Sequence, residues 1–296
     1  MGTNRTLCSL NQVNKEEEKF LERIGIPVRS SNPVMNSLSN SSSPYQSDYG
    51  HAQTSTADYS GEQAKATRPM TVDDVVTKTG ITLAIIIAFA VVNFGVAVFV
   101  DRGIAMILTL VGGIGGFITV LVATFAKKWG SATVTLIYAA LEGLFVGGFS
   151  LLLSGFLDGN VDAGALIGQA ILGTVGVFLG MLFVYKTGAV KVTPRFNKIL
   201  TGAIFGVVVL ALGNFVLAIF TGNSPLRDGG MLAIIFSLVC IVLAALSFMT
   251  DFDAADNMIR RGAPSNYAWG VALGLAVTLV WLYTEILRLL SYFQQR

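Results

Sequence analysis

The chain has 296 residues, of which 53% are hydrophobic and only 13% charged, and its mean hydropathy is +0.66. This composition is typical of membrane proteins and excludes an ordinary soluble domain. The net charge of +2 and the lack of a basic stripe give no sign of nucleic-acid binding. Because the only histidine is His51 and the cysteines Cys8 and Cys240 are isolated, we expect no disulfide and no histidine-based metal site.

Residues 1–70 are predicted to form a disordered polar tail. The stretch 37–44 consists mainly of serine and cannot bury enough apolar surface to offset its conformational entropy. Thr71 then precedes Asp73 and Asp74, which is the pattern of a helix N-cap with acids in the first turn. We therefore expect a membrane domain over residues 71–296.

Seven apolar runs fill this domain, and each is long enough for a membrane helix, which needs about 20 residues. None shows the alternation of a barrel strand. The sequence therefore predicts an all-α membrane protein, a bundle of seven transmembrane helices in contact with the lipid bilayer. The expected spans are 79–100, 104–126, 131–154, 163–185, 199–220, 231–252 and 267–291.

Lysines and arginines flank these spans unevenly. The N-terminal flank and the connectors after the second, fourth and sixth spans carry eleven, whereas the other connectors carry two. Cytoplasmic loops are enriched in these residues. We therefore expect a multi-pass protein of the inner or plasma membrane, with its N-terminus in the cytoplasm and its C-terminus outside.

Six glycine pairs have the GxxxG spacing, which removes side chains from one helix face and lets two backbones approach closely. The spacing favours packing inside the bundle but also fits a homodimer, so the oligomeric state stays open. The pairs are Gly112/Gly116, Gly143/Gly147, Gly164/Gly168, Gly176/Gly180, Gly202/Gly206 and Gly270/Gly274.

Four carboxylates inside the apolar runs are the candidate functional residues: Glu142, Asp251, Asp253 and Glu285. An ionised acid at the centre of a membrane helix costs at least about 2.5 kcal/mol, so such acids usually serve a function. A rise of about 1.5 Å per residue places Glu142 and Asp251 at similar depths and Glu285 farther out.

Two facing carboxylates in a low-dielectric environment cannot both ionise at low cost, so they share one proton. Without that proton the pair offers hard oxygen ligands to Ca²⁺. With it, the pair can form a hydrogen bond between helices and hold a pathway shut. Such a pair would link pH to the passage of a divalent cation.

Each acid also has a structural interpretation. Glu285 and Arg288 stand three residues apart on one helix and can form a local ion pair. Asp253 can be a solvated helix-end residue near Arg260. Glu142 has no cationic neighbour in its own span, and its alternative is a neutral acid that is hydrogen-bonded to a backbone carbonyl.

Four segments of the chain carry a resemblance to a known family. They are Arg29–Val34 (RSSNPV), Leu246–Asp253 (LSFMTDFD), Arg261–Pro264 (RGAP) and Thr278–Leu290 (TLVWLYTEILRLL). Together they resemble the actinobacterial-type branch of the Bax inhibitor family, over residues 29–296. The resemblance implies seven helices with the last one central and a pH-sensitive Ca²⁺ leak. It also implies suppression of cell death in eukaryotic members and control of a membrane protease in some bacterial ones.

The resemblance also assigns residues. Asp251 and Glu285 resemble the family's sensing pair of aspartates on helices six and seven. Lys127 and Lys128 are the nearest matches to a basic latch near the start of helix three, and Arg288 is a further candidate latch. The sequence departs from the family pattern in two ways. The second acid is Glu instead of Asp, and 34 positions separate Asp251 from Glu285, which is more than expected. Either helix seven starts late, or Asp251 pairs with Glu142 instead.

The sequence therefore predicts a protein that is not an enzyme and holds no cofactor. It would conduct cations, with Ca²⁺ as the transported ion, through an acid-lined pathway gated by pH. The sensing acids would be Asp251, Glu285 and Glu142, with Asp253 as a weaker substitute for Asp251. The alternative is a non-conducting regulator that binds a membrane protease or another regulatory protein. An intramembrane enzyme is not expected, because the spans contain no histidine and no protease signature.

Overall fold

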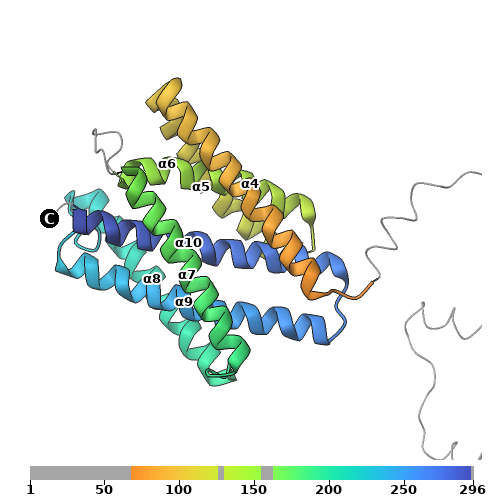
Figure 1. The fold of residues 1–296 in the computed structure, drawn as a ribbon. Helices are drawn as coiled ribbons and strands as arrows, with labels where there is room; N and C mark the ends of the chain where they lie inside the picture. Colours follow the sequence, from red (N-terminus) through yellow and green to blue (C-terminus); the bar gives the residue numbers. More distant parts are fainter. Residues whose placement is uncertain (1–67, 126–129, 155–162, 295–296) are drawn as a thin grey trace, which may run out of the picture. The chain divides into compact units, whose positions relative to one another are not determined.

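The computed structural model describes residues 68–125, 130–154 and 163–294, and these form seven long helices and no strand (Figure 1). The predicted all-α class and the seven-helix architecture are confirmed. All seven helices are long and apolar enough to cross a membrane. They are α4 (Val72–Phe99), α5 (Arg102–Phe125), α6 (Ala132–Leu153), α7 (Ala163–Thr187), α8 (Pro194–Thr221), α9 (Met231–Arg260) and α10 (Ala268–Gln294), with a short 3₁₀ turn, η2 (Ser265–Tyr267), before α10.

Two sequence predictions lie outside the described residues: the disordered state of the tail up to residue 67, and the latch role of Lys127 and Lys128. The predicted N-cap does lie within them. The Thr71 hydroxyl accepts from the Asp74 amide while the Asp74 carboxylate accepts from the Thr71 amide, which is a complete capping box. This cap starts α4 seven residues before the predicted span.

Helix α9 continues eight residues beyond the predicted end of its span at residue 252. The extension is polar and is supported by contacts four residues apart. Asn257 donates to Asp253 at 2.9 Å, and Arg260 pairs with Asp256 at 2.9 Å. Such pairs stabilise an exposed helix by a few tenths of a kcal/mol each, about 0.2–0.5. Hydropathy alone could not find this part of the helix, because it is not apolar.

Helix α10 is the central element, as the family resemblance implied. It packs against α4, α6, α7 and α9, and it runs between them in Figure 1. Leu282 and Leu287 on α10 are completely buried, as is Ala276. Because lipid is as apolar as leucine, close packing and polar links, rather than exclusion from water, must hold this helix in place.

Two of the glycine pairs bring helices into contact inside the bundle. A Cβ atom at Gly112 would lie 2.5 Å from the carbonyl oxygen of Leu141 on α6. One at Gly143 would lie 2.5 Å from the carbonyl oxygen of Ile86 on α4. The packing interpretation is thus confirmed for the α4–α5–α6 group. Elsewhere the outcome differs, because an added Cβ would meet no described atom within 4 Å at Gly164, Gly168, Gly176, Gly180, Gly202, Gly206 or Gly274.

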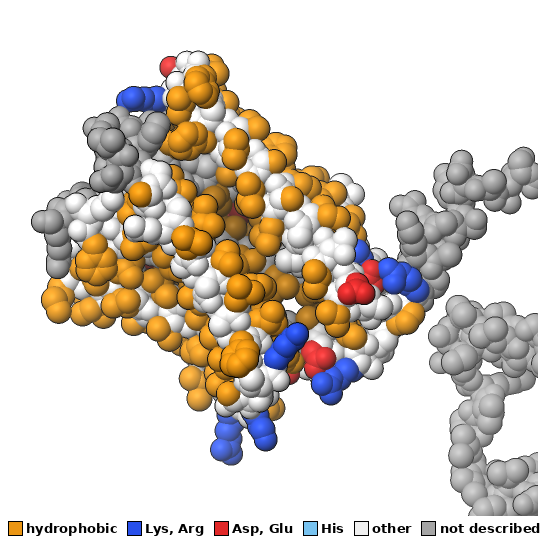
Figure 2. Space-filling view, in the orientation of Figure 1, with side chains coloured by type: hydrophobic (Ala, Val, Ile, Leu, Met, Phe, Trp, Pro, Cys, Tyr) orange, Lys and Arg blue, Asp and Glu red, His pale blue; other side chains and the backbone are white. Residues whose placement is uncertain are grey.

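The surface of the described helices is mostly apolar. Figure 2 shows hydrophobic side chains over most of the visible face, with charged groups mainly at its edges. Large exposed residues such as Leu172, Phe205 and Phe220 would be costly in water but suit contact with acyl chains. This surface agrees with a protein that is embedded in a bilayer.

Candidate functional site

Asp251 lies on the face of α9 that packs against α10. The hydroxyl of Thr278 on α10 donates to Asp251 Oδ2 at 2.7 Å. The same hydroxyl lies 3.3 Å from the carbonyl oxygen of Gly274 in its own helix. No lysine or arginine among the described residues forms an ion pair with Asp251. Among the described residues, the hydrogen-bond partner of Asp251 across the helix pair is therefore a neutral donor.

A pocket of about 300 Å³ opens beside Asp251, between α9 and α10. Both helices contribute small residues to its walls, Ala254 and Ala255 on α9 and Gly270 and Gly274 on α10. Small side chains on both helices leave a gap that no described residue fills. The Gly270/Gly274 pair, which was predicted to promote packing, thus lines an opening next to the acid. The remaining lining residues are Met258, Tyr267, Val271 and Leu275.

Glu285 has a different environment. Its Oε1 accepts from Arg288 at 2.5 Å, and both side chains are buried, with 4% and 6% of each residue exposed. The Arg288 guanidinium also stacks over the ring of Phe149, 5.4 Å from its centroid. Oε2 of Glu285 and the hydroxyl of Tyr292 are buried without a hydrogen-bond partner. The structure thus contains the local ion pair between Glu285 and Arg288, which was the structural interpretation of Glu285 in the sequence analysis.

Asp251 and Glu285 therefore do not form a direct pair, which corrects the arrangement implied by the resemblance. Thr278, the partner of Asp251, precedes Glu285 by seven residues on α10, a rise of about 10 Å. Helix α10 begins at Ala268, one residue after the predicted start at 267, and does not start late. The separation of 34 positions therefore keeps Glu285 away from Asp251. Arg288, a candidate latch, pairs with the acid on its own helix.

Glu142 lies on α6 at nearly the same level as Asp251. Thr135 donates to the Trp269 carbonyl oxygen, and the hydroxyls of Ser150 and Tyr283 are 2.7 Å apart, so α6 and α10 run parallel in register. Counting from these links places Glu142 beside about residue 276 of α10, within about 3 Å of the level of Thr278.

The Glu142 side chain points elsewhere, however. Its Oε2 lies against α5, where a Cβ at Gly116 would be 2.6 Å away. No hydrogen bond joins it to Asp251, and none joins it to a backbone carbonyl, in the part of the chain that the structure describes. The structure thus supports the predicted shared depth of Glu142 and Asp251 but shows no contact between their carboxylates.

Asp253 lies two residues closer to the end of α9, where it accepts from Asn257. Its neighbour Asp256 pairs with Arg260 and accepts from the Tyr185 hydroxyl at 3.4 Å. These contacts fit the helix-end interpretation of Asp253. No three acids, histidines or cysteines of the described residues gather into a metal cage. A cation at Asp251 would thus be held by few protein ligands, which suits transient rather than permanent binding.

Thr278 is the residue of this site that sequence analysis missed. A threonine in an apolar helix usually bonds to its own backbone, and Thr284 does so with the Trp281 carbonyl. The available signal was helical spacing, because Gly270, Gly274 and Thr278 recur every four residues on one face. Only the pairing of α9 with α10 reveals that this face meets Asp251.

Comparison with protein families gives one match. A family model described as "Bax inhibitor 1 like" matches residues 32–295, which is most of the chain. A search of curated proteins finds no match.

Proposed function

Because the chain belongs to the Bax inhibitor 1-like family, we propose that this multi-pass membrane protein lets cations, chiefly Ca²⁺, leak across the bilayer in a pH-dependent manner. The observation that carries the proposal is the environment of Asp251. This acid lines a pocket in the interior of a membrane helix pair, and its only described hydrogen-bond partner is a neutral hydroxyl.

The mechanism follows from the two protonation states of Asp251. The carboxylate offers oxygen ligands to a cation that enters the pocket, with the Thr278 hydroxyl holding one oxygen in place. The protonated acid carries no charge and can donate to a neighbouring helix, which removes the attraction for cations. Flux should therefore rise as pH rises and fall as pH falls.

The other acids take different roles. Glu142 shares the level of Asp251 and would add a second charge to the pathway on the α5–α6 side. Glu285 is neutralised by Arg288, so it would stabilise α10 at the far end rather than sense protons directly. Asp253 would act on cations near the entrance at the end of α9.

The proposed orientation places the N-terminus in the cytoplasm. The start of α6 and the α9–α10 connector lie at the same end of the bundle, since Gly130 lies against Asn266, and both are preceded in sequence by basic pairs, Lys127–Lys128 and Arg260–Arg261. Basic residues at one end are expected on the cytoplasmic side of a plasma or bacterial inner membrane.

Purified protein in vesicles of neutral lipid, loaded with a Ca²⁺-sensitive dye, tests this proposal. Protein-containing vesicles should admit Ca²⁺ faster at pH 8 than at pH 6, and empty vesicles should show no such difference. Flux that is unchanged in the double variant Asp251→Asn with Glu285→Gln would exclude the acid-lined leak.

A second function, a non-conducting regulator of a membrane protease or a related protein, is favoured by a separate observation. The glycine faces of α7 and α8 are open at Gly176, Gly180, Gly202 and Gly206, where an added Cβ atom would meet no other described residue within 4 Å. Such faces suit another transmembrane helix. Vesicles without any Ca²⁺ flux at either pH, together with a crosslinked partner on these faces, would favour the regulator.

A further inference from the structure

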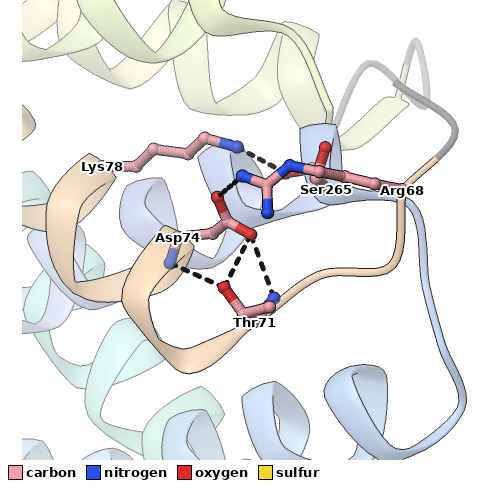
Figure 3. A network of polar contacts seen from close by, with 5 residues as sticks. All are labelled: Arg68, Thr71, Asp74, Lys78 and Ser265. Carbon is pink, nitrogen blue, oxygen red and sulfur yellow. Dashed lines mark hydrogen bonds and ion pairs between the residues drawn. The ribbon is translucent and has the colours of Figure 1, made fainter. Parts of the chain in front are cut away.

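The chain just before α4 is tied to the connector between α9 and α10 (Figure 3). The Met70 amide donates to the Ala263 carbonyl oxygen at 2.7 Å, and the Ser265 amide donates to the Arg68 carbonyl oxygen at 2.9 Å. Pro69 and Pro264 face each other in an isolated antiparallel bridge. We call this pairing of residues 68–70 with residues 263–265 the clasp.

Side chains reinforce the clasp on both sides. The Arg68 guanidinium pairs with Asp74 at 2.5 Å, and Asp74 in turn completes the capping box with Thr71. Lys78, one turn farther along α4, donates to the Ser265 carbonyl oxygen and lies over the ring of Trp269, 5.6 Å from its centroid. The start of α4 is thus attached to the start of α10 by charge as well as by backbone.

Met70 anchors the clasp in the apolar core. Only 2% of this residue is exposed, and it belongs to a cluster that includes Phe248 and Phe252 on α9 and Leu275 on α10. Leu275 also lines the pocket beside Asp251. The anchor of the clasp and the pocket therefore share a wall.

The clasp also fixes the ends of the two helices that form the pocket. The connector turns at Gly262, whose φ of +64° is accessible mainly to glycine, and then enters the bridge at Pro264. Met258 and Tyr267, which flank this connector, are the pocket residues nearest the clasp. If the connector were released, α9 and α10 could separate at this end, because the pocket already lies between them here.

We propose that the clasp is a conformational switch that holds the α9–α10 pair closed around the Asp251 pocket, and that its release opens the pocket at the connector end. The clasp is suited to this role because part of it is exposed, with 52% of the Arg68 side chain accessible. The switch does not depend on the proposed leak, since opening is a structural event that can be measured alone.

Thiol labelling of the pocket tests the switch. Cys8→Ser and Cys240→Ala remove the native thiols, and Gly274→Cys places a reporter where a Cβ has open space. A small water-soluble maleimide is then applied to the purified full chain in detergent. The reporter should be labelled about fivefold faster in Met70→Ala and in Lys78→Gln than in the parent. This factor is expected for the loss of about one net contact of hydrogen-bond strength.

Matched controls separate opening from general loosening. Val76→Ala and Asp73→Asn change exposed positions on the same turns of α4 and should leave the labelling rate unchanged. A reporter at Gly176→Cys on α7, which also has open space but lies outside the pocket, should not respond to Met70→Ala or Lys78→Gln.

A crosslink tests the same switch in the opposite direction. Pro69 and Pro264 occupy the non-hydrogen-bonded type of antiparallel pair, where Cα atoms lie about 4.5 Å apart, which suits a disulfide. In the Lys78→Gln background, oxidised Pro69→Cys with Pro264→Cys should return labelling of the reporter to the parent rate, and reduction should reverse this. Equal labelling rates with the clasp intact, weakened and crosslinked would overturn the proposal.

Discussion

Two acids lie at the central helix, and their surroundings differ. Asp251 approaches α10 from α9 and meets a threonine hydroxyl beside an open pocket. Glu285 belongs to α10 and meets an arginine in a closed, buried environment. The partner of Asp251 is a neutral hydroxyl, whereas the partner of Glu285 is a buried guanidinium that compensates its charge. The difference teaches that two acids beside the same helix can have opposite surroundings, one with a neutral partner and one with a cationic partner.

The largest expected effect comes from breaking the buried ion pair between Glu285 and Arg288. Arg288→Met removes the ion-pair partner of the buried Glu285 carboxylate, and breaking a buried pair in this way should lower the free energy of unfolding by about 3–5 kcal/mol. Denaturant titration in detergent micelles measures this. Adding Glu285→Gln to Arg288→Met should restore most of the loss, and Arg195→Met at an exposed site should change little. A single Arg288→Met variant that is as stable as the parent would contradict the assignment of Glu285 and Arg288 as a stabilising ion pair.

Filling the pocket should have a smaller effect on stability but a clear effect on flux. Gly274→Leu places a branched side chain into the space beside Asp251, so Ca²⁺ flux at pH 8 should fall about tenfold, as expected if entry becomes about 1.4 kcal/mol less favourable. The matched variant Gly176→Leu, on an open face away from the pocket, should conduct normally. Equal flux in both variants would show that cations do not pass Asp251 through this opening.

The fold and the site differ in how much the sequence could reveal. Seven apolar runs predicted seven helices because each span must satisfy its own backbone hydrogen bonds in lipid. The spacing of Glu285 and Arg288 on one helix allowed their ion pair to be anticipated. The contact between Asp251 and Thr278 could not be, since it depends on the register of α9 against α10. Likewise, Gly143/Gly147 and Gly202/Gly206 have the same spacing, and only the arrangement of the bundle decides which pair is in contact.

Loss of the hydroxyl partner should shift, rather than abolish, the response of Asp251. Thr278→Val keeps the shape of the side chain but removes the hydrogen bond that favours the carboxylate, at a cost of about 1 kcal/mol. The midpoint of the flux–pH curve should therefore move to higher pH. Thr284→Val, whose hydroxyl bonds only within α10, should leave the midpoint in place. A midpoint that moves to lower pH would contradict the role of Thr278.

The smallest effect is expected at the end of α9. Asp253 bonds only to Asn257 among the described residues, on the polar extension of the helix. Asp253→Asn should change the free energy of unfolding by less than about 0.5 kcal/mol and should leave the pH dependence of flux intact. Loss of that dependence in Asp253→Asn would move the sensor from the pocket to the helix end.

The most direct test of the role of Asp251 compares Asp251→Asn with the parent in Ca²⁺-flux vesicles from pH 5 to pH 9. Asparagine keeps the size of the side chain and its contact with Thr278 but cannot change charge. We predict a parent whose flux rises with pH and an Asp251→Asn variant whose flux is low and the same at every pH. A variant that still responds to pH as the parent does would contradict Asp251 as the sensing acid.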